Sequence, residues 1–410
     1  MSKHDQPTSS PTSADISYWS LVRAEPMLVI IMGTVAGHLM IMGLLLPVLP
    51  LYAKTFGVGD AMLGLVITAF GIGRLLIDIP AGLLAERVGR KLLMFGGPLL
   101  IAVASIGCAL TESYFWLIVF RFLQGVGAGA YMTAAMVVCA DLSTPETRGR
   151  IMALYQSALL VGAGAGPAVG GLLAARLGYE SVFWLSMVIG LVSATYTLLR
   201  ARETKQSDRH GESHSLRLFV PILKSPALMI ALLVSLGVFM TRSSAFMQLM
   251  PLLGNERYQL GPEHIGYGFV LLAAANFLML PTAGRMVVRY GTMPLVVGAC
   301  VGLAIGMSLA ALANSVVMFF VAMTILGLAS GLEGPSLSSY AAAHAPDGRF
   351  GPTMGAMRFT GDIGYVLGPV LLGALVDHTT LGYSGALLVA AALLILIGAV
   401  FALMAQDHGR

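Results

Sequence analysis

The chain of 410 residues contains twelve apolar runs, and each of them is long enough to cross a membrane. A helix needs about 20 mostly apolar residues to span a bilayer, whereas a strand of a membrane barrel needs about 10 alternating ones. Because backbone groups must be hydrogen-bonded within lipid, runs of this length predict helices. We expect spans near 26–50, 62–84, 92–111, 114–137, 150–174, 181–200, 222–250, 264–284, 292–312, 316–340, 352–375 and 383–404. The sequence therefore predicts an all-α membrane protein with twelve transmembrane helices.

The second half of the chain repeats residue types of the first half at a constant offset of 202 residues. This offset relates Gly82, Arg87, Gly89, Gly125, Gly162, Gly166 and Pro167 to Gly284, Arg289, Gly291, Gly327, Gly364, Gly368 and Pro369. The bundle is therefore expected to consist of two pseudo-symmetric six-helix halves. We predict an N-terminal tail over 1–25, halves over 26–200 and 222–404, a linker over 201–221, and a C-terminal tail over 405–410.

Positive residues predict the orientation of the bundle, because cytoplasmic loops collect Lys and Arg. If the N-terminus is inside, the inner side holds seventeen of the twenty-four Lys and Arg residues, and the outer side holds only Lys54, Arg176 and Arg257. Both termini are therefore expected in the cytoplasm. This bias accounts for the net charge of +4, so no nucleic-acid partner is expected. The short loops favour the cell inner membrane, and we expect a monomer in its lipid bilayer.

The sequence lacks the motifs of several enzyme classes. It has no Walker-type Gly-Lys-Ser or Gly-Lys-Thr loop, no His-Glu-x-x-His and no nucleophile elbow. Cys108, Cys139 and Cys300 fall within apolar runs without paired spacing, so neither disulfides nor a zinc site are expected. We therefore expect no metal, no cofactor and no enzymatic activity, and an ion gradient or the solute gradient must supply any energy for transport.

A glycine-bounded basic segment lies between the second and third runs. It reads Gly82-Leu83-Leu84-Ala85-Glu86-Arg87-Val88-Gly89-Arg90-Lys91. Gly82 and Gly89 permit close packing and a tight turn, while Arg87, Arg90 and Lys91 can pair with Glu86. Together with the twelve spans and the repeat, this segment resembles the signature of the major facilitator superfamily of secondary transporters, over the whole chain. The family usually has Asp at the position of Glu86, so the acid is kept while the residue differs. The resemblance implies that this segment takes part in conformational change.

Two further stretches are similar to motifs within the superfamily. Arg121-Phe122-Leu123-Gln124-Gly125 is similar to an Arg-x-x-Gln-Gly stretch, whose Arg the family associates with proton coupling. A role confined to helix packing is an equal alternative for Arg121. The fifth run resembles the signature of the antiporter branch, through Gly162, Gly166, Pro167, Gly170 and Gly171. Packing alone could also explain these small residues.

Charged residues inside the spans are functional candidates, because they are costly in lipid. Arg74 and Asp78 in the second span, and Arg358 and Asp362 in the eleventh, are each spaced four apart on one helical face. The resemblance implies that these two spans pack together, so we predict an inner gate whose charges pair across the halves when the cytoplasmic side is closed. The alternative is that each Arg neutralises the Asp of its own helix and no gate exists.

Proton coupling and solute binding have separate candidates. Glu333 is the leading proton carrier because it lies in an apolar span, Asp362 is the alternative, and His38 can also titrate in the relevant range. A structural, hydrogen-bonded role is the other interpretation of His38. The neutral amides expected to line a substrate cavity are Gln124, Gln156, Gln248 and Asn276.

These observations favour a secondary active transporter that works by alternating access on a small-molecule substrate and protons. The leading hypothesis is a proton-coupled antiporter that exports a drug-like or amphipathic molecule. The alternative is an importer or facilitator of a small polar or anionic metabolite, with Arg74, Arg121 or Arg358 binding the anion. A transporter-like sensor that no longer cycles is a remote third possibility.

Overall fold

The computed structural model describes residues 21, 23, 25–144, 147–204, 220–346 and 349–406. Within these ranges every regular element is a helix, and twelve helical spans are long and apolar enough to cross a membrane. The first half contains α2 (Pro26–Leu45), α3 (Leu49–Lys54), α4 (Asp60–Val88), α5 (Arg90–Leu110), α6 (Tyr114–Asp141), α7 (Arg148–Leu177) and α8 (Glu180–Arg200). The second contains α9 (Val220–Lys224), α10 (Pro226–Ser244), η2 (Ala245–Leu249), α11 (Met250–Tyr258), α12 (Pro262–Tyr290), α13 (Met293–Leu312), α14 (Val316–Ala343), α15 (Phe350–His378) and α16 (Gly382–Gln406). The predicted all-α fold with twelve spans is confirmed. Most of the predicted tails and linker lies outside the described residues.

Several helices extend a few residues beyond the predicted spans, as α12 does at both ends, and two predicted spans are interrupted by a proline or a helix cap. The first was expected to run to residue 50, but α2 ends at Leu45 and the separate helix α3 follows, because Pro47 cannot continue a helix. The seventh was expected to begin at residue 222, but Ser225 starts a new helix there by accepting a hydrogen bond from the Leu228 amide. A single π-helical turn, η2, then joins α10 to α11.

The packing of the first half is repeated in the second. Helix α2 lies against α7 as α10 lies against α15, and α4 lies against α6 as α12 lies against α14. Two equivalent glycines mark the equivalent contacts: a Cβ on Gly125 would lie 2.0 Å from the Phe70 carbonyl oxygen, and one on Gly327 would lie 2.2 Å from that of Leu272. Gly125 and Gly327, like Phe70 and Leu272, differ by 202 in number. The duplication predicted from the sequence is therefore visible in the backbone contacts.

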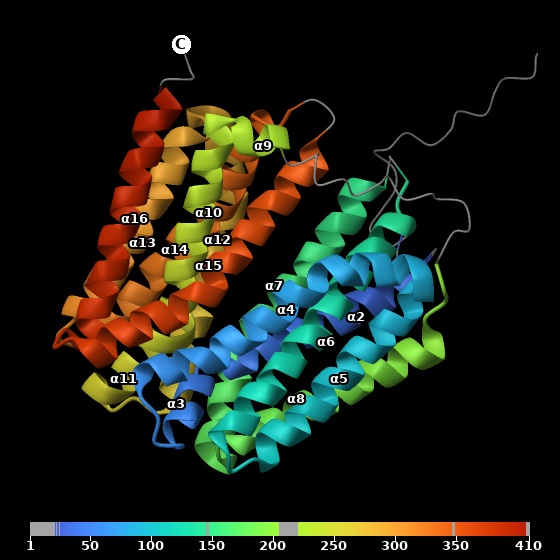
Figure 1. Ribbon diagram of the computed structural model, residues 1–410, viewed down its shortest axis with the longest axis horizontal. Helices are drawn as coiled ribbons and strands as arrows, with labels where there is room; N and C mark the ends of the chain where they lie inside the picture. The colour runs from blue at the N-terminus through green and yellow to red at the C-terminus, as the bar shows by residue number, and fades with distance from the viewer. Residues whose placement is uncertain are drawn as a thin grey trace, which may run out of the picture.

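The two halves meet along two helix pairs, α4 with α15 and α7 with α12. Figure 1 shows the halves converging near α3 and α11 and diverging toward the end where the C-terminus is marked. We call the converging end the Asp60 end, after the first residue of α4, and the other the Gly89 end, after the turn between α4 and α5. A cluster of buried apolar side chains, which includes Leu49, Leu63 and Leu249, joins the halves near the Asp60 end.

Candidate functional site

A cavity of about 910 Å³ lies between the two halves, bounded by residues of α2, α4 and α7 on one side and of α10, α12 and α15 on the other. Its walls are mostly apolar, and its aromatic side chains are those of Phe70, Phe239, Phe246, Phe269, Phe277 and Tyr365. The polar side chains on the wall are those of Arg74, Ser157, Arg242, Ser243 and Asn276. Among the described residues, no carboxylate lines this cavity. A large apolar pocket with a few polar groups suits an amphipathic solute.

One charged pair lies in the wall formed by the second half. Arg242 Nη1 on α10 donates to Glu333 Oε2 on α14 over 3.1 Å. The guanidinium carbon lies 5.8 Å from the ring centroid of Phe239 and 5.6 Å from that of Phe246. Glu333 is buried and does not line the cavity, whereas Arg242 does. Arg242 thus lies between the cavity and Glu333, the predicted proton carrier.

A second charged pair joins the two halves. Arg74 on α4 donates to the carboxylate of Asp362 on α15, and Arg358 Nε approaches the other carboxylate oxygen to 4.0 Å. Asp362 is buried, while Arg74 lines the cavity and lies near the ring of Tyr365. Asp78 Oδ1 is buried and has no hydrogen-bond partner among the described residues. The four predicted gate residues thus lie in one region, and Arg74 pairs across the interface instead of with Asp78. This pair is formed although the halves diverge at the Gly89 end, so its formation does not require that end to be closed, as the predicted gate did.

The other two proton-coupling candidates lie apart from the carboxylates. Arg121 is buried, donates from Nη1 to Gln124 Oε1 over 2.7 Å, and lies over the Phe70 ring. It adjoins a small gap of about 10 Å³ that shares Tyr365 with the main cavity. His38 is buried beside the Tyr131 ring, with a centroid distance of 5.3 Å, and its Nδ1 has no partner among the described residues.

The four amides expected to line the cavity lie in different places. Asn276 does line it. Gln124 is buried between Arg121 and Ser105, where its Nε2 donates to the Ser105 hydroxyl over 2.8 Å. Gln248 is buried and donates to the Asp60 carbonyl oxygen over 2.7 Å, while Gln156 is exposed outside the cavity lining. The structure uses these two buried amides to satisfy polar groups of neighbouring helices, which is why they do not face the cavity.

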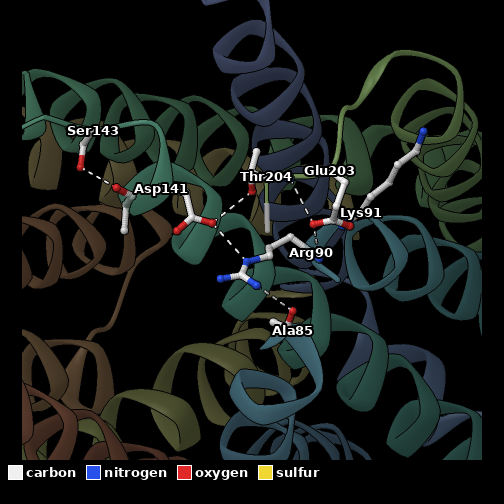
Figure 2. A network of polar contacts seen from close by, with 8 residues as sticks. Ala85, Arg90, Lys91, Asp141, Ser143, Glu203 and Thr204 are labelled. Atoms are coloured by element: carbon white, nitrogen blue, oxygen red, sulfur yellow. Dashed lines mark hydrogen bonds and ion pairs between the residues drawn. The ribbon is translucent and has the colours of Figure 1, made fainter. Parts of the chain in front are cut away.

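The basic segment after α4 forms a polar network at the Gly89 end, shown in Figure 2. Arg90 is buried, donates from Nε to Asp141 Oδ2 over 3.1 Å, and donates from Nη1 to the Ala85 carbonyl oxygen. The Glu203 carboxylate accepts from the backbone amides of Arg90 and Lys91, over 2.9 and 3.1 Å. It therefore caps the N-terminus of α5, where an anion is favourable.

The two glycines of the basic segment have different surroundings. Gly89 has a φ of +96°, a conformation that glycine adopts without strain, and a Cβ there would also overlap the Glu203 carboxylate. Gly82 has open space where a Cβ would lie, so close packing does not explain it. The expected pairing of the basic residues with Glu86 concerns a side chain outside the described part of the chain. Arg87 interacts with a partner group and is therefore not a free cation.

The Asp60 end is held by polar contacts between the halves. Asp377 near the end of α15 accepts from the backbone amides of Asp60 and Ala61, over 2.8 Å in each case. The Tyr383 hydroxyl donates to Asp60 Oδ1 over 2.8 Å, and Gln248 binds the Asp60 carbonyl. The first turn of α4 is therefore capped by the opposite half of the molecule.

Comparison with known proteins identifies the family of this bundle. The sequence model of the Major Facilitator Superfamily matches residues 31–277 and 256–409. The chain belongs to the major facilitator superfamily. Among curated relatives it is 22% identical over 340 residues to an uncharacterized MFS-type transporter, MJ1560, of Methanocaldococcus jannaschii, covering 82% of this chain and 87% of that protein. It is 27% identical over 169 residues to the quinolone resistance protein NorA of Staphylococcus aureus, covering 41% of this chain and 43% of NorA.

Solved structures show the same superfamily fold. A bacterial homolog of the human lysosomal transporter Spinster, in an inward-facing and occupied conformation, has a TM-score of 0.79 at 16% identity, covering 94% of this chain and 97% of that one. With the twelve apolar helices and the family match, this likeness indicates a multi-pass membrane transporter of the superfamily.

The small residues of α7, which resemble the superfamily's antiporter motif, lie at helix contacts. A Cβ on Gly162 would lie 2.1 Å from the Ala36 carbonyl oxygen, and one on Gly170 would lie 2.1 Å from that of Leu44. Gly166 and Pro167 also pack against α2, while Gly171 approaches the Pro262 carbonyl of α12. The motif thus brings α7 close to α2 within its half and to α12 across the interface.

Four residues that shape this superfamily site were not assigned a role from the sequence. Arg242 lies within an apolar span, and the cost of an arginine in lipid is the signal that could have identified it. Asp141, Glu203 and Asp377 lie at or beyond helix ends, where charged residues are common, so the sequence offers no signal that separates them from solvated ones.

Proposed function

We propose that this transporter exports an amphipathic small molecule in exchange for protons, by alternating access. The observation that carries the proposal is the apolar cavity between the halves, with a buried carboxylate behind each of its two arginines. The partial similarity to a protein named for quinolone resistance, and the glycines of α7, support the export direction.

In this proposal, Asp362 couples protonation to movement of the halves. Its carboxylate binds Arg74 of the other half, so adding a proton to it removes the charge that holds α4 and α15 together at that point. The solute would enter when the cavity is open at the Gly89 end. After the halves rotate and the solute leaves, a proton taken up at the Asp60 end by Asp362 or Glu333 would reset the carrier.

The remaining predicted residues have supporting roles in the proposal. Arg121 adjoins the main cavity through Tyr365, and it would hold positive charge next to the proton pathway. His38 would be an internal proton acceptor. The segment from Gly82 to Lys91 would stabilise one conformation of the Gly89 end through the contacts of Arg90 with Asp141 and of Glu203 with α5.

Import of a negatively charged metabolite is the second candidate. It is favoured by one observation, namely that Arg74 and Arg242 are the charged residues on the cavity wall. The size and apolar character of the cavity favour an amphipathic solute over a small polar one in either case.

Vesicle transport separates these candidates. We expect inside-out membrane vesicles with an acidic interior to accumulate the solute, and the Asp362→Asn variant to lose this accumulation. Concentrative uptake by intact cells would instead support import. If neither assay showed movement of any solute in a broad panel, transport would be refuted and the non-cycling sensor would be the remaining hypothesis.

A further inference from the structure

We propose that the transported molecule carries an anionic group and that Arg242 is the residue that binds this group. The inference rests on the proposed function only in taking the cavity as the transport site, and it holds for either direction of movement. It concerns a residue on the cavity wall whose role the sequence does not reveal.

Both ion pairs at the cavity are oriented with their positive ends toward the space. Arg74 and Arg242 line the cavity, while their partners Asp362 and Glu333 are buried behind them and do not. Each pair is neutral as a whole, yet a solute in the cavity meets the guanidinium first. Because water is largely replaced by apolar walls, this orientation should matter more than it would at a surface. A cationic solute would meet two like charges there.

Arg242 has unused capacity to bind such a group. Glu333 is the sole hydrogen-bond acceptor of its guanidinium among the described residues, and it engages Nη1 alone. A guanidinium has five N–H donors, so Nε and Nη2 retain donors for a carboxylate or similar anion. The flanking rings of Phe239 and Phe246 restrict where the guanidinium can lie and offer apolar surface to the rest of the solute.

The repeat supports an uneven division of charge between the walls. Arg74 and Asn276 are equivalent positions, because their numbers differ by 202, and both line the cavity. At this repeat position the first half therefore has an arginine and the second half has a neutral amide. The arginine of the second half, Arg242, lies at a different repeat position. Arg74 is already committed to Asp362 across the interface, which leaves Arg242, paired within its own half, as the arginine suited to binding a solute.

Three matched probes test the charge preference. Naphthoxyacetate, its methyl ester and the corresponding naphthoxyethyl-trimethylammonium compound share one ring system and differ in charge. Isothermal titration of the purified protein should give the carboxylate about tenfold or greater advantage in Kd over the ester, as a hydrogen bond to a charged group would. Equal binding of all three, tighter binding of the ester or the ammonium compound, or no binding of the carboxylate would overturn the proposal.

Variants locate the binding group. Arg242→Lys keeps the charge but loses the planar donor edge, so it should lose most of the preference for the carboxylate. Arg242→Met alone would leave the Glu333 carboxylate buried without its partner. The double variant Arg242→Met, Glu333→Gln avoids this buried charge and should still remove the preference for the carboxylate probe. Arg176→Met is the matched control, because Arg176 is exposed in the last turn of α7 and does not line the cavity. A preference that survives in the double variant would also overturn the assignment.

Flux measurements separate this inference from the proposed function. If the carboxylate binds through Arg242 but a proton gradient does not drive its movement in vesicles, proton-coupled transport fails and the binding assignment stands. If a proton gradient drives only neutral or cationic compounds, transport stands and the anion assignment fails.

Discussion

Replacing Asp377 by Ala should shift the protein toward conformations that are open at the Asp60 end. The Asp377 carboxylate accepts two hydrogen bonds of 2.8 Å, from the amides of Asp60 and Ala61 in the opposite half. Loss of an N-terminal helix cap typically costs about 1 kcal/mol, and the exposure of Asp377 argues against a larger value. These bonds exist only while the Asp60 end is closed, so the open population should rise about fivefold.

Spin labels at Leu177 and Leu381 would measure this shift, because both residues are exposed at the Asp60 end and lie in different halves. Double electron-electron resonance between the two labels should show a larger fraction of long distances in Asp377→Ala than in the parent protein. Asp377→Asn, which keeps one acceptor oxygen, should be intermediate. Glu112→Ala, also at an exposed position of this end, is the control and should change nothing. An unchanged distance distribution in Asp377→Ala would refute the role of this contact.

Three further substitutions test the described contacts. Gly89→Ala should lower the free energy of unfolding by about 1–3 kcal/mol in thermal denaturation, because an L-residue is strained at positive φ and its Cβ would meet Glu203. Gly82→Ala is the control and should have little effect, because a Cβ there would meet open space. Gly170→Ala should lower the free energy of unfolding by about 1–3 kcal/mol, because its Cβ would overlap the α2 backbone. Gly164→Ala in the same helix is the control, because a Cβ there would meet open space. Equal melting temperatures of the two variants would contradict this packing. Asp362→Asn should make solute flux in vesicles independent of the imposed pH gradient while counterflow exchange persists, and flux that still follows the gradient would exclude Asp362 as a required proton site.

The sequence predicted the helical fold because the solvent restricts the choices. Lipid forces backbone groups to pair within each span, so run length alone determines the element type and approximate position. Boundaries such as the end of α2 at Leu45 depended on Pro47, a local signal that a count of apolar residues does not use. The offset of 202 residues predicted equivalent helix contacts because glycines at such contacts have no room for a side chain, as at Gly125 and Gly327.

The site was less predictable, because partner choice depends on helix rotation. Arg74 is four residues from Asp78, yet it pairs with Asp362 on another helix. Gln124 and Gln248 looked like cavity residues, but their amides satisfy polar groups in buried helix contacts instead. A single sequence gives the residue types within a span but not the direction that each side chain faces.

The contact of α7 with α12 also bears on how fast the carrier can turn over. A Cβ on Gly171 would meet the Pro262 carbonyl and one on Gly266 would meet the Pro167 carbonyl, so the two backbones come into direct contact at these glycines. Relative movement at these two positions requires no glycine side chain to change rotamer. These close glycine contacts should therefore contribute little to the energy barrier between the access states, and the rate should depend more on the other contacts between the halves, such as the ion pair of Arg74 with Asp362 and the hydrogen bonds at Asp60.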